Sequence, residues 1–259
     1  MCHRAAKTLV SVCLIAFGSL SASAARKTIR LPPPRPLDLG VPSPAKPATP
    51  PSKIEPSAAD NHVLRAQVLA SGHVIGHDLA SIADHGGCGI AAPLQLDAIL
   101  LPDGAKVTLV PPVIMRASLA AALADWLRQD LAPAVAIKGD ELTKIEGVGA
   151  YECRSRDGVA GAKLSEHATG DALDLRAFAT KHGKLLVIAP QTDADAYREQ
   201  AILAVMKASA CARFTTVLGP GSDSYHAQHL HIDLEARRYG THLCQWILPH
   251  VARDMKKQE

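Results

Sequence analysis

Aromatic residues are scarce in this chain, at 3% of its 259 residues, and no cluster of lysine and arginine is interleaved with them. Nucleic-acid-binding domains usually show a strong basic patch or stacking aromatics. The charge is also nearly balanced, with 28 Lys and Arg against 25 Asp and Glu and a formal net charge of +3. We therefore expect no nucleic-acid partner.

The apolar stretch near the N-terminus, residues 9–20, is shorter than the roughly 20 residues that a bilayer core requires. Arg4 and Lys7 precede it, and the small residues Ala22-Ser23-Ala24 follow it. This layout is typical of a secretory signal with its cleavage site. We expect residues 1–24 to be a cleaved signal peptide, the protein to be periplasmic or secreted, and no stable membrane insertion to remain after cleavage.

Close Cys-x-x-Cys spacing is absent, which argues against a cysteine-rich zinc site. Signal removal leaves four of the six cysteines, an even number in a chain bound for an oxidising compartment. Disulfides are therefore expected. Four cysteines allow three pairings, between which the sequence does not decide; we expect Cys88 with Cys153 and Cys211 with Cys244.

Most of the 18 prolines fall between residues 31 and 56, where no packed core can form. Such a tract predicts a semi-rigid spacer. We interpret it as a plain tether rather than as a ligand for an aromatic groove, and any partner is unknown. The expected organisation is a signal peptide (1–24), a disordered proline-rich linker (25–60), one domain (61–245) and a C-terminal tail (246–259).

Within the domain, apolar and polar residues follow both strand and helix periods. The helical segments are 118–131, which we expect to end at Pro133, and 193–210. The strand-like segments are 105–110, 149–154, 172–176, 184–188 and 230–234. Strands and helices are mixed without regular alternation, which favours an α+β fold with a small, mostly antiparallel sheet flanked by helices.

Two of the predicted strands carry ionisable side chains on one face. Residues two apart share a face of a strand, so Leu230 and Ile232 point away from the row His229, His231 and Asp233. The same parity places Asp174 opposite its leucine neighbours. An unpaired buried charge is costly, so ionisable rows on otherwise apolar strands indicate a polar site. A metal ion would give these side chains a partner.

His167, Asp174 and His231 offer the N/O/N donor set of a catalytic zinc that leaves its fourth position to water. Gly170 permits the bend that would bring His167 back to Asp174. The loop at 219–222 would leave His226 free to reach into the same cleft. The remaining histidines are expected at the surface, namely His62, His73, His77, His85, His182, His242 and His250.

These motifs resemble those of two groups of zinc peptidases. Residues 165–174 match the Ser-x-His-x-x-Gly-x-Ala-x-Asp motif of D-alanyl-D-alanine carboxypeptidases. His226, His229 and His231 match the His-x-x-His-x-His run of penicillin-insensitive murein endopeptidases. With Cys88-Gly89-Ile90 and residues 151–154 included, the chain resembles the bacterial extensin-like C-terminal family more closely, over roughly 61–244.

The resemblance implies a fold of the hedgehog/DD-peptidase type and one zinc ion held by His167, Asp174 and His231. It also implies that His229 and His226 are catalytic and that Arg154 polarises the scissile carbonyl. Ser165 and Arg154 would contact the substrate. One departure is Gln228, which stands where the carboxypeptidases carry a glutamate base and which cannot take a proton.

The sequence thus predicts a secreted zinc metallopeptidase that hydrolyses a D-alanyl peptide bond in peptidoglycan or its muropeptides, a DD-endopeptidase in preference. Zinc-activated water would attack the carbonyl, and His229 would be the general base. The alternatives are a DD-carboxypeptidase and a non-catalytic, zinc-stabilised wall-binding module.

Overall fold

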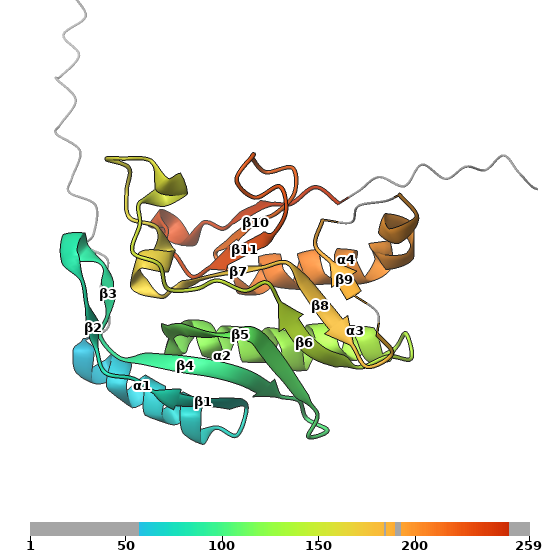
Figure 1. Cartoon of the computed structure of the whole chain (residues 1–259), viewed down its shortest axis with the longest axis horizontal. Coiled ribbons are helices and arrows are strands. Elements are labelled where there is room, and N and C mark those ends of the chain that lie inside the picture. The colour runs from blue at the N-terminus through green and yellow to red at the C-terminus, as the bar shows by residue number, and fades with distance from the viewer. Residues whose placement is uncertain (1–56, 184, 190–192, 249–259) are drawn as a thin grey trace, which may run out of the picture. The chain divides into compact units, whose positions relative to one another are not determined.

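The computed structural model describes residues 57–183, 185–189 and 193–248 (Figure 1). The predicted signal peptide, the linker up to residue 56 and the tail from 249, with His250, lie outside the described residues. The first helix, α1, begins at Ala58, slightly before the expected start of folding at Asn61. Ser57 caps it, since the Ser57 hydroxyl accepts the backbone N–H of Asp60 at 3.1 Å.

The larger sheet has six strands in the order β1-β4-β5-β6-β8-β9. Its pairs are antiparallel except β5 with β6, which run parallel. Its strands are β1 (Val74–Asp78), β4 (Pro93–Leu100), β5 (Lys106–Arg116), β6 (Leu142–Glu146), β8 (Ala177–Thr180) and β9 (Leu185–Val187).

A second sheet has four strands in the order β12-β10-β11-β7. These are β12 (Leu243–Gln245), β10 (Thr216–Leu218), β11 (Leu230–Asp233) and β7 (Ala172–Leu175). A short ribbon pairs β2 (Ile82–Ala83) with β3 (Gly89–Ile90). The predicted α+β class is confirmed, but the single small sheet is wrong: the described strands form separate sheets, each of the two larger ones with one parallel pair.

The longer helices are α1 (Ala58–Ala70), α2 (Ala117–Trp126), α3 (Ala132–Ala136) and α4 (Asp193–Arg213). A π-helical turn, η2 (Leu127–Leu131), joins α2 to α3. Shorter 3₁₀ turns are η1 (His85–Gly87), η3 (Arg156–Gly158), η4 (Glu166–Thr169) and η5 (Arg238–Gly240). Figure 1 shows α2 running behind β4 and β5, and α4 packs against α2, η2 and β10.

Two sequence predictions are wrong: the end of a helix at Pro133 and a strand at 149–154. Pro133 does not end the helix, because it lies in the first turn of α3, where a missing N–H removes no helical hydrogen bond. The predicted strand at 149–154 is absent. Its backbone partners change along the segment: Gly149 bonds to Asp174 on β7, and Tyr151 to Ile114 on β5. No continuous ladder can form.

β5 is longer than predicted and continues through Pro111 and Pro112. Proline cannot donate to a sheet ladder. The two prolines fall where the register between β5 and β4 is interrupted, between Leu96 and Ala98. The interruption therefore removes the need for a donor at these positions.

The hydrophobic core joins both sheets to the helices. Trp126 of α2 makes edge-on contacts with Phe178 of β8 and with Phe214, at ring-centroid distances of 5.9 and 5.6 Å. Such pairs add stabilisation beyond the area that they bury. Trp246 is also only 2% exposed, so the packed domain extends just past the predicted boundary at residue 245.

Two disulfides join distant segments with the predicted pairing. Cys88 pairs with Cys153 and Cys211 with Cys244, at Cα–Cα distances of 5.5 and 5.6 Å. The first ties the start of β3 to the segment that carries Arg154, and the second ties α4 to β12. Both accord with an oxidising compartment. None of the helices in the described residues is long and apolar enough to span a membrane.

Candidate metal centre

Three side chains from three elements form a group that could hold a metal ion: His167 of η4, Asp174 of β7 and His231 of β11. β7 and β11 are antiparallel neighbours, and their register sets His231 directly opposite Asp174. Such partners have neighbouring side chains on one face of the sheet. The predicted alternation is confirmed, because Leu173, Leu175, Leu230 and Ile232 are fully buried on the core side.

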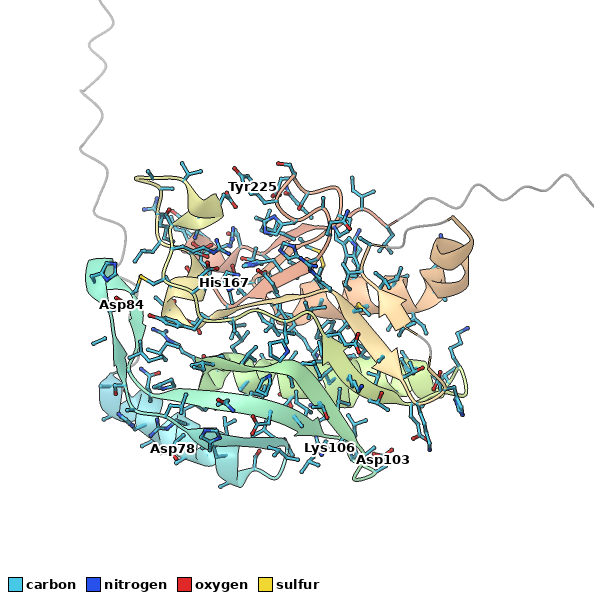
Figure 2. The ribbon with its side chains drawn as sticks, viewed as in Figure 1. Asp78, Asp84, Asp103, Lys106, His167 and Tyr225 are labelled. Carbon is cyan, nitrogen blue, oxygen red and sulfur yellow. A yellow bond between two sulfur atoms is a disulfide. The ribbon has the colours of Figure 1, made fainter. Side chains whose placement is uncertain are left out.

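The turn η4 places His167 against these strands (Figure 2). Ser165 is its N-cap, and the Ser165 hydroxyl accepts the backbone N–H of His167 at 3.3 Å. Gly170 ends the turn in the left-handed region, with φ 72° and ψ 18°, as the sequence predicted. A Cβ at this position would collide with Ile90. The glycine is therefore needed for both conformation and space.

The donor atoms of the three residues lie within 4.8 Å of one another. The distances are 3.0 Å from His231 Nδ1 to Asp174 Oδ1, 3.3 Å from His167 Nε2 to Asp174 Oδ2, and 3.2 Å between the two ring nitrogens. His167 and His231 are buried, at 2% and 8% exposure. The structure thus brings together all three predicted ligands.

The outward-facing ring nitrogens of both histidines have acceptors. The Ala150 carbonyl accepts from His167 Nδ1 at 2.6 Å, and Asp233 Oδ2 lies 3.2 Å from His231 Nε2. Asp233 is buried, at 4% exposure. Because these partners are acceptors, each outward nitrogen can donate a hydrogen to them, and the inward nitrogen is then the one that would bind an ion once it has lost any proton of its own. Partners of this kind orient metal-binding histidines.

The resulting donor set fits a cation. Two nitrogen lone pairs only 3.2 Å apart, with a carboxylate facing them, cannot hydrogen-bond one another without an added proton or ion. Burial disfavours the charged forms of Asp174 and of His231. Yet hydrogen bonds from the histidines hold the pKa of Asp174 far below its usual range, and those to Asp174 and Asp233 raise the pKa of His231 to about 9. N/O donors of this type suit Zn²⁺ among divalent ions.

Metal binding at this group should depend on pH. Since the metal-free ring of His231 has a pKa of about 9, it is protonated at neutral pH and must lose a proton when an ion binds. Apparent affinity should rise about tenfold per pH unit as pH increases from 6 to 8, with release of about one proton per ion. Calorimetry with Zn²⁺ in buffers of different ionisation enthalpy measures both quantities, and a pH-independent affinity would contradict this prediction.

Two further histidines reach the same cavity, which has a volume of about 480 Å³. The ring of His226 lies 5.2 Å from that of His229 and 5.5 Å from that of His231. His229 Nε2 is 3.5 Å from Asp174 Oδ1. As predicted, the turn at 219–222 precedes the loop from which His226 enters; Ser222 N–H donates to the Gly219 carbonyl at 3.0 Å.

Arg154 also lines the cavity, although the strand predicted to carry it is absent. Its Nε donates to Glu152 Oε2 at 2.7 Å. Ser165 lines the cavity as well, but the observed contact of its side chain is the cap of η4. Contact of Arg154 or Ser165 with a substrate stays a prediction.

Two features were missed by sequence reasoning: Asp223 in the cavity wall, and a charge cluster around Glu235 whose members Arg156 and Arg237 line the cavity. Asp223 holds the ring of His226, and its only sequence signal is an aspartate in a turn-rich loop three residues before a histidine. Glu235 is 7% exposed and pairs with Lys163 at 2.6 Å and with Arg237 at 2.7 Å, as well as with Arg156. Lys163 and Arg156 lie 72 and 79 residues away in sequence, so no local pattern reveals this cluster.

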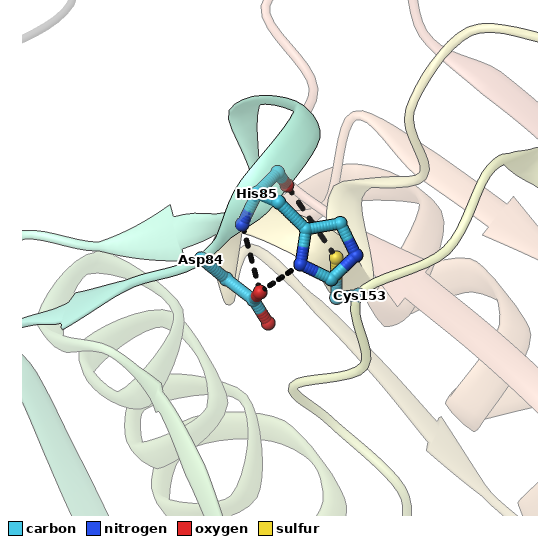
Figure 3. A group of neighbouring side chains, drawn as sticks. All are labelled: Asp84, His85 and Cys153. Atoms are coloured by element: carbon cyan, nitrogen blue, oxygen red, sulfur yellow. Dashed lines mark hydrogen bonds and ion pairs between the residues drawn. The ribbon is translucent and has the colours of Figure 1, made fainter.

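A second group with metal-binding residue types, Asp84, His85 and Cys153, lies at the surface (Figure 3). The sulfur of Cys153 is bonded to Cys88, so it cannot serve as a thiolate ligand. Asp84 and His85 pair with each other at 2.6 Å. His85 is exposed, as predicted.

The other histidines expected at the surface largely follow that prediction. His73 is half-buried, and the exposed ones are His62, His77, His182 and His242. His182 pairs with Asp140 at 3.0 Å. None of these residues belongs to the metal-binding group.

Fold and site together define an α+β domain with a buried His–Asp–His group that could bind a metal ion. The chain belongs to the family described as extensin-like protein C-terminus, whose sequence model matches residues 65–245. That match includes every residue of the site. Comparison with curated proteins and comparison with solved structures both give no match.

Proposed function

We propose that the protein is an exported zinc metallopeptidase that hydrolyses a D-alanyl peptide bond of peptidoglycan, preferably as a DD-endopeptidase. The observation that carries the proposal is the convergence of His167, Asp174 and His231 with two further histidines in one cavity. The motif resemblance to DD-peptidases supplies the substrate class. Two disulfides support export.

His167, Asp174 and His231 would hold the zinc ion. When bound, zinc supplies Lewis acidity that lowers the pKa of a water molecule and polarises a carbonyl. The surrounding side chains supply proton transfer and charge stabilisation. Arg154 can donate to the oxygen on which negative charge develops, and a neutral histidine can accept the proton of water.

His226 and His229 are the available proton acceptors. Gln228, where a glutamate base would stand in the carboxypeptidases, is exposed and has no basic group. Burial lowers the pKa of His226, although Asp223 partly opposes this, so its ring is neutral at physiological pH. This state suits a base. The absence of the glutamate favours endopeptidase over carboxypeptidase activity.

Digestion of defined crosslinked muropeptides by the zinc-loaded protein tests the proposal. We expect mass analysis to show new free amines and loss of the crosslinked species. Asp174→Ala should release none, because the ligand set is broken, whereas His77→Ala changes an exposed histidine of β1 and should act like the wild type.

The same digestion separates hydrolysis from binding. Co-sedimentation of the zinc-loaded protein with chemically unchanged sacculi, without release of fragments, would overturn the hydrolase and identify a wall-binding module. Release of terminal D-alanine without loss of crosslinks would instead identify a carboxypeptidase.

A further inference from the structure

We infer that His226 is the residue that moves the proton and that Asp223 is its positioning residue. This inference rests on the proposed hydrolase and assigns, between two histidines of one cavity, the one that acts as base. It reverses the sequence expectation, which gave that role to His229.

The carboxylate of Asp223 fixes the ring of His226. Its oxygens lie 2.8 and 2.9 Å from His226 Nδ1. The pKa of Asp223 is lowered, since hydrogen bonds from His226 outweigh burial, so the carboxylate is ionised and can only accept. Nδ1 therefore carries the hydrogen, and Nε2 keeps its lone pair for the cavity. The side chain of His226 is only 11% exposed, which limits alternative positions of the ring.

Asp223 also fixes the backbone from which the ring projects. Its Oδ1 accepts the N–H groups of Tyr225, at 2.8 Å, and of His226, at 3.0 Å. Asp223 thus fixes the backbone of the turn that carries His226. That loop leads directly into β11, which carries His231, so the ring of His226 is held in a defined place relative to the metal-binding group. Figure 2 shows Tyr225 at the outer edge of this loop.

His229 lacks a comparable support. Its Nε2 faces Asp174 Oδ1 at 3.5 Å, the carboxylate of a metal ligand. This contact to Asp174 is the one polar contact observed for the ring of His229 within the described residues. The contact of His229 with Asp174 is longer than the two contacts of 2.8 and 2.9 Å that hold His226, and its carboxylate is shared with both histidines of the metal-binding group. Of the two rings, His226 is the one held at short distance by a carboxylate outside the metal-binding group while it lines the cavity, the arrangement that orients a general base.

The proton balance follows from this geometry. An O–H bond of the attacking water breaks, its oxygen forms the new bond to the carbonyl carbon, and the proton goes to Nε2 of His226. Asp223 stabilises the resulting imidazolium. When the C–N bond breaks, His226 returns the proton to the leaving amine nitrogen, so the ring ends neutral.

The kinetic test compares zinc-loaded Asp223→Asn, Asp223→Glu, His226→Ala and His229→Ala on a crosslinked muropeptide. We expect Asp223→Asn to lower kcat by about 10²- to 10⁴-fold, because the wrong tautomer is favoured, with KM and zinc content unchanged. Asp223→Glu should recover part of kcat. Adding Asp223→Asn to His226→Ala should cost little more, because the two act as a unit. Wild-type kcat in Asp223→Asn, or a larger loss in His229→Ala than in His226→Ala, would overturn the inference.

Nitrogen-15 NMR of labelled histidines tests the same arrangement without turnover. His226, assigned by its loss in His226→Ala, should show Nδ1–H in the wild type and Nε2–H in Asp223→Asn. If the wild type cuts no muropeptide, the proposed function fails while this readout still decides the tautomer. An Nε2–H tautomer in the wild type overturns the inference even if the protein is an active hydrolase.

Discussion

Alanine in place of His231 is expected to abolish stoichiometric zinc binding. The substitution removes one of three converging donors, and it leaves the buried carboxylate of Asp233 without the ring that it contacts at 3.2 Å. Loss of a partner behind a ligand already costs about 10- to 100-fold in metal affinity, so loss of the ligand itself should cost more. The measurement is zinc content after dialysis together with titration calorimetry.

Two further variants test whether the loss of zinc binding is specific to His231. Asp233→Asn keeps all three donors but weakens the orientation of His231, so its affinity should fall by about 10- to 100-fold. His77→Ala should bind zinc like the wild type. Added zinc should raise the melting temperature of the wild type but not that of His231→Ala, because only a protein that binds the ion is stabilised by it. Retention of one zinc per chain by His231→Ala would refute the assigned site.

Removal of the Cys88–Cys153 disulfide is expected to lower the free energy of unfolding by about 4 kcal/mol, from the chain-entropy estimate for a long closed loop. The bond joins residues 65 apart in sequence. The double variant Cys88→Ser with Cys153→Ser, unfolded in urea under non-reducing conditions, measures the effect. Loss of this bond also frees the segment that carries Arg154, so activity should fall along with stability.

The other disulfide is an internal comparison. Cys211 and Cys244 are 33 residues apart, about half the separation of the first pair. Loop-closure entropy then predicts a loss smaller by about 0.6 kcal/mol for the matching double serine variant. An unchanged unfolding midpoint after removal of Cys88–Cys153 would show that the bond contributes nothing to stability.

The elements that carry two of the three candidate ligands could be predicted from the sequence because their patterns are strictly alternating. In β11 and β7 the apolar side chains fill the core, so the polar side chains must share the opposite face. The position of His167 could be predicted from Gly170, because a glycine between His167 and Asp174 permits the bend that brings the two side chains together. These are local signals, and each required only a few adjacent residues.

Features that depend on distant partners could not be predicted. The segment 149–154 has strand-like composition, but it bonds in turn to β7, β5 and η4, and no local pattern encodes such a path. The helical segment continues past Pro133 because the π-helical turn at Leu127–Leu131 separates α2 from α3, so that Pro133 lies in the first turn of α3. The cations around Glu235 come from a part of the chain more than 70 residues away. The choice between His226 and His229 needed the position of Asp223.

His231 and Asp174 face each other across one rung of the β7–β11 ladder. Sliding either strand by one residue would turn its ligand inward and a leucine or isoleucine outward, because side chains alternate with period two. An ion bound there would link the two strands, and it would stabilise only the register in which His231 lies opposite Asp174. If the group holds a metal ion as proposed, the supply of that ion during folding would then govern how faithfully β7 and β11 pair.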